Sequence, residues 1–265
     1  MSNPAQTYED YMVPALFGPW ARRLVDSVPP RPQDRVLDLA CGTGVVARAA
    51  ASRVGPAARI TGVDLNPRML EVARAAAARE GRAIEFREAR AESLPFPDRG
   101  FDVALCQFAL MFMDDRPKAL AELHRVLAPG GRLGLSVWQG LDRHPFYATL
   151  DRVIERRAGI SALRTIFALG DEAELRALLE GAGFAEVAIQ SVSMTARFPN
   201  PAGFLAGEID LDTAAIPSMQ SLDERERRAL TEAIGEEMQI PLAQVIEGDH
   251  VVIPFHASIA RAESD

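Results

Sequence analysis

The stretch Val36–Ala47 constrains the chain more than any other, because its pattern predicts a buried strand, a glycine turn and a helix in succession. The first four residues are apolar except for Asp38, and Gly42 and Gly44 then turn the chain into the helix. Glycine suits this turn because a side chain would obstruct both the turn and a ligand lying against the backbone. The helix N-terminus also leaves unpaired N–H groups facing such a ligand. The stretch therefore predicts a nucleotide-type pocket in an α/β fold.

Two acidic residues indicate which nucleotide is bound. The spacing Gly42-x-Gly44-x-x-Ala47 also fits a dinucleotide fingerprint. Asp38 argues against a dinucleotide, because a carboxylate there would repel a pyrophosphate by several kcal/mol at roughly 4 Å in a partly dry cleft. It would favour a ligand bearing an ammonium or sulfonium group. Asp64 ends the next apolar strand, where a carboxylate accepts both ribose hydroxyls. We therefore expect a cationic cofactor with a ribose and disfavour a nicotinamide-dependent enzyme.

Four motifs in order resemble those of class I S-adenosylmethionine-dependent methyltransferases. They are most similar to the small-molecule branch that includes the ubiquinone/menaquinone-biosynthesis C-methyltransferases. The resemblance covers roughly residues 31–138, with a weaker continuation to about residue 195. The motifs are Val36–Gly44, Gly62–Leu70, Ala91–Asp98 with Phe101-Asp102, and Arg125–Arg132.

This resemblance implies a fold and a domain organisation. The expected fold is α/β, with a doubly wound, Rossmann-like, mainly parallel seven-stranded sheet. Residues 1–30 should form an N-terminal helical cap, interrupted near Pro14 and Pro19. Residues 31–265 should form the S-adenosylmethionine-binding methyltransferase domain, including a helical lid insertion over 198–249 between the last two strands.

The expected cofactor is S-adenosyl-L-methionine. In the family an aliphatic side chain stacks on adenine, which implies this role for Leu65, with Met69 as a further candidate. Arg90 stands where the family usually has an aspartate that accepts from the adenine amino group, and arginine has no acceptor. Adenine would then be held by the Ala91 backbone, by Glu92, or by stacking of Arg90. The predicted cofactor-binding residues are Asp38, Ala40, Gly42, Thr43, Gly44, Asp64, Leu65, Met69, Ala91, Glu92 and Gln107.

The acceptor is expected to be a small apolar or aromatic molecule. Cys106-Gln-Phe-Ala109, after the fourth strand, differs from the Asp/Asn-Pro-Pro-aromatic tetrapeptide of methyltransferases that grip a base or amide. The acceptor would pack against Phe108, Met111 and Phe112, and Tyr11 or Phe17 of the cap could touch the cofactor. Other candidate acceptor contacts are Glu208, Asp210, Asp212 and His256, and a solvated charged face explains the three acidic residues equally well.

Methyl transfer from a sulfonium is an in-line displacement that needs mainly alignment. Near-attack geometry can supply roughly 7–11 kcal/mol of the barrier, so neither a nucleophilic residue nor a metal is required. A phenol, enol or thiol acceptor would still benefit from a base, whereas a neutral amine would not. His144 is the predicted catalytic base, because it follows the fifth strand in the expected loop 139–147 at the ligand-bearing edge of the sheet.

The predicted function is methyl transfer to an O, C or N atom of a small, hydrophobic or aromatic metabolite. The alternative is a protein that binds S-adenosylmethionine without transferring methyl, such as a repurposed cyclase or a regulator. A net charge of −8 provides no overall field for nucleic acid or an anionic membrane. We therefore expect a small-molecule partner, no nucleic acid, no membrane, and a monomer or homodimer.

Localisation is expected to be cytoplasmic. The N-terminal residues lack the basic and apolar pattern of a signal peptide. The longest nearly unbroken apolar run, Val103–Met113, is too short to span a bilayer. Cys41 and Cys106 show neither disulfide nor metal-ligand spacing, as suits a reducing compartment.

Overall fold

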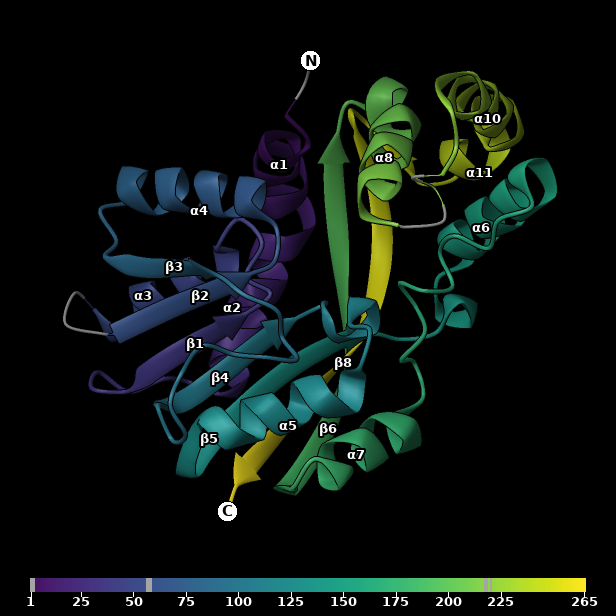
Figure 1. Cartoon of the computed structure of the whole chain (residues 1–265). Helices are drawn as coiled ribbons and strands as arrows, with labels where there is room; N and C mark the ends of the chain where they lie inside the picture. The colour runs from purple at the N-terminus through teal and green to yellow at the C-terminus, as the bar shows by residue number, and fades with distance from the viewer. Residues whose placement is uncertain (1–2, 56–58, 217–218, 220) are drawn as a thin grey trace.

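The computed structural model describes residues 3–55, 59–216, 219 and 221–265, which build one central sheet flanked by helices (Figure 1). The strand order is β3-β2-β1-β4-β5-β8-β6, and the short β7 pairs with β8. The predicted Rossmann-like fold is confirmed, with β7 as an additional strand. The strands are β1 Arg35–Leu39, β2 Arg59–Asp64, β3 Ile84–Glu88, β4 Phe101–Gln107, β5 Leu127–Trp138, β6 Phe184–Pro199, β7 Ile246–Glu247 and β8 His250–Ser264.

The central parallel strands consist almost entirely of buried apolar residues, as expected for strands covered on both faces. In the register, Val36 of β1 lies beside Ile60 of β2 on one side and Val103 of β4 on the other. Because these strands run in parallel, their carboxyl ends meet at one edge of the sheet. That edge carries the crevice in which open α/β sheets bind ligands.

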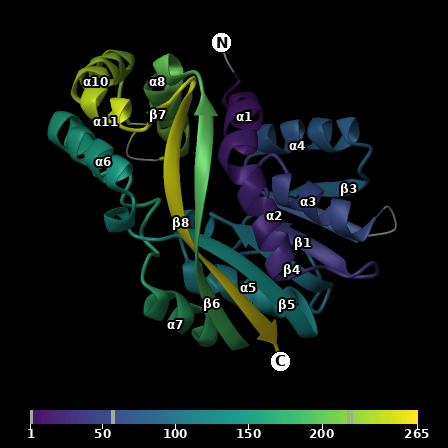
Figure 2. The same cartoon turned by 180° about the vertical axis from the view of Figure 1, so that it is seen from behind.

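Helices cover both faces of the sheet. Figure 1 shows α5 and α7 in front of it, and Figure 2 shows α2 and α3 on the opposite side. The α-helices are α1 Pro4–Thr7, α2 Gly18–Ser27, α3 Val45–Val54, α4 Pro67–Arg79, α5 Arg116–Val126, α6 Pro145–Ala158, α7 Glu172–Gly181, α8 Pro201–Ala215, α10 Glu224–Glu237 and α11 Gln239–Ala243. The short 3₁₀ helices are η2 Leu110–Phe112 and η3 Leu141–Arg143.

The N-terminal cap is a nearly continuous helix that changes winding. Between α1 and α2 it forms a ten-residue π-helix, η1 (Tyr8–Phe17), with Pro14 inside it. The Gly18 N–H donates to the Val13 carbonyl, a bond five residues long. The predicted interruption near Pro14 is therefore a change to π winding rather than a break. Such winding is rare and occurs frequently at functional sites.

The last two long strands, β6 and β8, extend beyond the rest of the sheet as an antiparallel ribbon (Figure 1). Their register runs from Phe184↔Ser264 to Pro199↔His250. With 16 and 15 residues, β6 and β8 are at least twice as long as the central strands β1 and β4, which have 5 and 7. The chain between them forms α8, α10, α11 and β7, and α6 packs against α10 and α11 at the same end. A helix at 145–158 replaces the second part of the predicted loop 139–147. Among the described helices, none is both long and apolar enough to cross a membrane.

Candidate functional site

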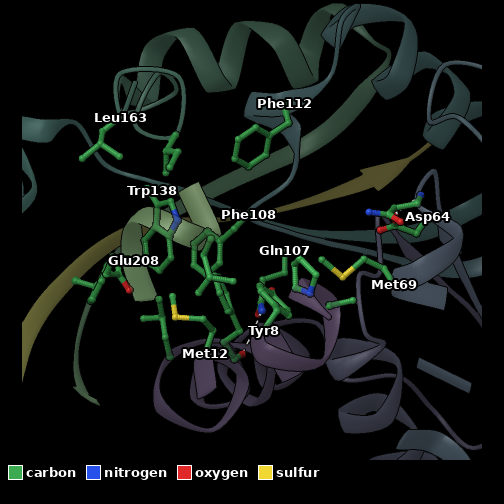
Figure 3. Close-up of a pocket in the computed structure, with 18 of the residues that line it drawn as sticks. Tyr8, Met12, Asp64, Met69, Gln107, Phe108, Phe112, Trp138, Leu163 and Glu208 are labelled. Atoms are coloured by element: carbon green, nitrogen blue, oxygen red, sulfur yellow. Dashed lines mark hydrogen bonds between the residues drawn. The ribbon is translucent and has the colours of Figure 1, made fainter. Parts of the chain in front are cut away.

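A cavity of about 650 Å³ opens at the carboxyl edge of the sheet, between the N-terminal cap and the helices carried by β6 and β8 (Figure 3). Most of its lining side chains are apolar, and many are aromatic. The lining residues are Pro4, Ala5, Tyr8, Met12, Leu16, Phe17, Asp64, Leu65, Asn66, Arg68, Met69, Gln107, Phe108, Phe112, Trp138, Tyr147, Leu163, Ile166, Phe167, Glu208, Leu211 and Phe255.

Asp64, the last residue of β2, is held in one orientation by backbone donors. Its Oδ2 accepts from the Gly42 N–H and its Oδ1 from the Asn66 N–H, each at 2.8 Å. Burial raises the pKa of this carboxyl above its ordinary value, and the backbone hydrogen bonds oppose that rise. Each carboxylate oxygen has a second lone pair for a ligand donor. The geometry is that of a fixed acceptor at one end of the cavity.

The turn after β1 has a left-handed backbone at Ala40, Gly42 and Gly44, with φ of 54°, 53° and 79°. The two glycines serve different purposes. A Cβ on Gly44 would lie 2.9 Å from the ring of Phe86, so packing requires glycine there. A Cβ on Gly42 would meet no described atom within 4 Å. The open space beside Gly42, adjacent to Asp64, is where a ligand could approach the backbone.

Asp38 is placed differently from the prediction that its charge faces the ligand. It is 1% exposed and lies outside the cavity lining. Its Oδ2 accepts at 2.8 Å from the N–H of Ala47, so it satisfies a donor in the first turn of α3. Burial raises the pKa of Asp38 to about 8, with a further contribution from Asp64. The carboxyl group of Asp38 therefore stabilises the turn by this hydrogen bond and does not face the cavity.

The predicted cofactor-binding residues divide into two groups. Those that line the cavity are Asp64, Leu65, Met69 and Gln107, whereas the cavity lining does not include Asp38, Ala40, Gly42, Thr43, Gly44, Ala91 and Glu92. Thr43 is completely buried, and its Oγ1 has no hydrogen-bond partner among the described residues. Leu65 is 54% exposed at the cavity, an unusual position for leucine that leaves an apolar surface free for a planar ring.

Arg90 has a side chain that is 51% exposed and forms ion pairs with Asp114 at 2.7 Å and Glu92 at 3.5 Å. Neither Arg90, Ala91 nor Glu92 lines the cavity. Stacking of Arg90 on adenine would require the guanidinium to leave these carboxylates, and it stays a prediction. Contacts to adenine by Ala91 or Glu92 stay predictions.

Gln107, at the end of β4, lies in the middle of the view in Figure 3. Its Nε2 donates to the Phe17 carbonyl at 3.1 Å. Its Oε1 is buried and accepts no hydrogen bond from the described part of the chain. A buried polar atom without a partner costs about 1–3 kcal/mol. With Asp64, this oxygen gives the cavity an acceptor set suited to a ligand with hydroxyl and ammonium donors, so these residues fit S-adenosylmethionine. Phe17 also lines the cavity, whereas Tyr11 donates to the Pro199 carbonyl outside it.

The next part of the cavity is aromatic. Phe108 has a left-handed backbone with φ 51°, which costs a non-glycine residue about 1–2 kcal/mol. This conformation stacks its ring on Trp138, with centroids 3.5 Å apart and planes 6° apart. Phe108 and Phe112 line the cavity as predicted, but Met111 is buried in the core because it faces away from the cavity.

Several lining residues were not predicted from the sequence. They include Tyr8, Trp138, Tyr147, Phe167 and Phe255. Tyr147 had a readable signal, because Pro145 followed by apolar residues at helical spacing predicts an amphipathic helix. The others come from separate elements, and nothing in their local sequence marks them.

His144 is the clearest correction. It is 1% exposed, lies outside the cavity lining, and precedes the first residue of α6. Its Nδ1 lies 3.0 Å from the Gly140 carbonyl, and its Nε2 accepts from the backbone N–H of His256 at 3.0 Å. Burial lowers its pKa. The structure contradicts the catalytic-base prediction, because the neutral ring has both nitrogens engaged by backbone.

Glu208 of α8 is the acidic acceptor-contact candidate that reaches the cavity. It is 5% exposed, and its Oε2 accepts from the Tyr147 hydroxyl at 3.1 Å. Burial raises the pKa of Glu208 to about 7, and the hydrogen bond from Tyr147 opposes that rise. Asp210 is exposed, and the side chain of Asp212 lies outside the described residues. His256 holds His144 through its backbone and does not line the cavity.

Comparison with known proteins agrees with this geometry. Residues 36–131 match the family model described as a methyltransferase domain. A demethylmenaquinone methyltransferase of Thermus thermophilus is 46% identical over 114 residues, which cover 43% of this chain and 51% of the relative. The ubiquinone/menaquinone biosynthesis C-methyltransferase UbiE of Hahella chejuensis is 40% identical over 126 residues, 47% of this chain and 51% of the relative. The crystal structure of the Bacillus subtilis YcgJ protein superposes with a TM-score of 0.60 at 20% identity, covering 92% of this chain and 98% of that one.

The fold and the matched residues define a class I S-adenosylmethionine-dependent methyltransferase domain, and S-adenosyl-L-methionine is the cofactor of that class. Within the class, the matched part of the chain is similar to the ubiquinone/menaquinone-biosynthesis methyltransferases, in agreement with the resemblance of the sequence motifs. The aligned part spans about half the length of these curated relatives. Outside the family match at residues 36–131 lie the N-terminal cap and four aromatic residues of the cavity lining, Trp138, Tyr147, Phe167 and Phe255.

Proposed function

We propose that the protein is an S-adenosylmethionine-dependent methyltransferase acting on a small, hydrophobic or aromatic metabolite. One observation carries the proposal. A single cavity joins Asp64 and Gln107 to the stacked rings of Phe108 and Trp138, so a cofactor and a flat apolar acceptor could lie in contact. The names of the matched relatives refer to quinone biosynthesis, and a quinol ring is an acceptor of this shape and polarity.

The roles of the cofactor residues follow from their placement. Asp64 would accept from the ribose hydroxyls, and Leu65 with Met69 would pack on adenine. The unpartnered Oε1 of Gln107 would accept from the amino group of the methionine part. We propose that the turn at Gly42 admits the ligand close to the backbone and that Asp38 acts indirectly by supporting this turn.

When bound, S-adenosylmethionine would supply a methyl group on a positively charged sulfur; an acceptor atom would bond to the methyl carbon in line as the methyl–sulfur bond breaks and S-adenosylhomocysteine leaves. The protein contributes orientation and exclusion of water. Phe108 and Trp138 hold the acceptor ring in a fixed plane, and the N-terminal cap covers the cavity through Tyr8 and Met12. Ordered positioning of this kind can supply roughly 7–11 kcal/mol of the barrier.

The cap over 1–30 and the lid over 198–249 are proposed to close the site around a small-molecule partner. We further propose a cytoplasmic monomer or homodimer with no nucleic-acid partner. The negative net charge of −8 supports the last point, because nothing in the overall field attracts a polyanion.

The decisive experiment combines binding with transfer. Calorimetric titration with S-adenosylhomocysteine and with NAD(P) tests the cofactor class. Incubation with methyl-labelled S-adenosylmethionine and a metabolite extract from the source cell, followed by mass spectrometry, tests transfer and identifies the acceptor. A labelled small molecule is the expected result. Cofactor binding without any label moved would favour the non-transferring alternative, and tight NAD(P) binding with no response to S-adenosylhomocysteine would overturn the assignment.

A further inference from the structure

A buried carboxyl group lies at the end of the cavity away from the cofactor residues. Figure 3 shows Glu208 and Asp64 on opposite sides of the view, with Gln107 and Phe108 between them. Glu208 contacts Tyr147, whose ring centroid lies 5.3 Å from that of Phe255, and both of these aromatic residues line the cavity. An acidic side chain in such surroundings is costly unless its oxygens find partners.

Only half of this carboxyl group is accounted for within the described chain. Oε2 accepts from the Tyr147 hydroxyl at 3.1 Å, whereas Oε1 is buried and accepts no hydrogen bond from any described residue. No ion pair joins Glu208 to a described arginine, lysine or histidine. Buried polar atoms in proteins nearly always have a partner. Since Glu208 lines the cavity, the partner of Oε1 can come from a bound molecule.

We propose that Glu208, oriented by Tyr147, selects an acceptor whose aromatic or otherwise apolar body carries a hydroxyl or amino donor. The inference rests on the proposed function and specifies its substrate class. Phe108, Trp138 and Phe255 contact the body of the acceptor, and Oε1 of Glu208 accepts its polar hydrogen. A site of this kind discriminates strongly against an analogue without the donor, because the buried oxygen is then left unpaired.

A purely structural role predicts something different. The hydrogen bond between Tyr147 and Glu208 joins α6 to α8 and could serve only to hold the lid together. That role uses one carboxyl oxygen and gives no preference among ligands. Loss of the Tyr147 hydroxyl would then weaken the lid as much as loss of the carboxyl group, whereas selection by Oε1 requires the carboxyl group alone.

The test uses a pair of probes that differ in one donor. Binding of 1-naphthol and of 1-methoxynaphthalene to the full chain is measured by calorimetry, both without and with saturating S-adenosylhomocysteine. The titrations are made at pH 8.5, where Glu208, with a pKa raised to about 7, is mostly ionised. A hydrogen bond to a charged group corresponds to about a 10- to 100-fold preference, so wild type should bind 1-naphthol more tightly by that factor. Glu208→Leu should reduce the preference to below about 3-fold, since its side chain has no acceptor.

Three further variants make the result specific. Glu208→Gln keeps the shape and a neutral acceptor, so its preference should fall between those of wild type and Glu208→Leu. Tyr147→Phe should retain most of the preference, because Oε1 remains. Asp210→Asn, on the same helix but exposed, is the matched control and should behave as wild type.

Either of two outcomes overturns the inference: wild type shows no preference for 1-naphthol, including the case in which neither probe binds, or Glu208→Leu and Glu208→Gln both retain the full preference. Failure of the proposed function is distinguished by S-adenosylhomocysteine itself. If it does not bind while the probes are still discriminated, the methyltransferase assignment fails and the selectivity of Glu208 stands. If it binds while the probes are not discriminated, only the selectivity fails.

Discussion

The cofactor end and the acceptor end of the cavity differ in which parts of the chain form them. The cofactor end depends on one stretch of sheet, where the backbone after β1, the carboxylate ending β2 and the amide ending β4 converge. The acceptor end is formed by aromatic side chains from the cap, the residues after β4, β5, α6, β8 and the residues between α6 and α7. A backbone-built site recognises a ligand common to a whole class, whereas a site built from side chains can change with each substitution. The two ends should therefore fail independently when residues are substituted.

Removal of the Asp64 carboxylate should produce the largest effect, confined to the cofactor end. Asp64→Ala should weaken S-adenosylhomocysteine binding about 100-fold or more, because two hydrogen bonds to a charged group are worth about 1.5–3 kcal/mol each. Calorimetry measures the effect, with Asp64→Asn as the shape-matched control of intermediate affinity. Binding of 1-naphthol in the absence of cofactor should change little. An unchanged dissociation constant for S-adenosylhomocysteine would mean that the ribose lies elsewhere.

The two glycines of the turn separate packing from ligand access. Gly44→Ala should lower the free energy of unfolding by roughly 1–3 kcal/mol, because its Cβ would approach Phe86 to 2.9 Å in a backbone region that disfavours side chains. Gly42→Ala should cost about 1 kcal/mol from backbone strain alone, yet weaken S-adenosylhomocysteine binding more than its stability loss suggests. Urea unfolding and calorimetry on both variants provide the comparison. Equal stability losses and equal affinities would remove the distinction.

Substitution of His144 should lower the stability of the fold without removing a group that takes part in methyl transfer. His144→Ala leaves the His256 N–H without its acceptor and should lower the free energy of unfolding by about 1–3 kcal/mol. Below its unfolding temperature the variant should keep the wild-type affinity for S-adenosylhomocysteine and the wild-type pH profile of methyl transfer. His144→Asn serves as a control that retains a side-chain acceptor. A transfer rate that loses its dependence on pH in either folded variant would restore the histidine as a base.

The last prediction concerns how the free energy of unfolding depends on pH through Asp38. Because burial raises the folded-state pKa of Asp38 from 3.8 to about 8, the native protein holds a proton that the unfolded chain releases. The contribution of Asp38 to the free energy of unfolding is therefore fully present below its pKa in the unfolded chain, 3.8, and is lost as the pH rises toward its pKa in the folded protein, about 8. Urea unfolding at pH 5, 6.5 and 8 should therefore show a shallower decline for Asp38→Asn than for wild type. Glu208, with a pKa raised to about 7, contributes in the same direction in both proteins. Parallel declines would exclude Asp38 as a source.

The sequence predicted that Asp64 and Gln107 lie at the same edge of the sheet, and it did so for a physical reason. A buried strand followed by Gly42 and Gly44, and an acidic residue at the next strand end, are local patterns whose geometry the parallel sheet completes. Asp64 and Gln107 could be placed together because both end strands of the same sheet. Asp38 was misjudged because a sequence does not show whether a carboxylate points toward a ligand or caps a helix beneath it.

The acceptor end was predicted only where it touches the same sheet edge. Phe108 follows β4 and was foreseen, but Phe255 reaches the cavity from a strand that joins the sheet more than a hundred residues later. The prediction for His144 shows an error of the other kind. Because His144 follows β5 closely in the sequence, we expected it beside the ligand, but it does not line the cavity. Instead, β8 places the backbone N–H of His256 where it donates a hydrogen bond to Nε2 of His144.

The pairing of Pro199 with His250 has a consequence for how this molecule can diversify. The fifty residues numbered 200–249 leave and re-enter the ribbon at facing positions, so their excursion has closely spaced ends. A segment anchored in that way can change in length or composition at modest entropic cost, while the strands that support it keep their register. The segment 200–249 can therefore be exchanged as a unit between related chains that share the β6–β8 ribbon. Transplanting it between related chains would carry the carboxyl group of Glu208 to a new scaffold and leave Asp64 and the glycine turn in place.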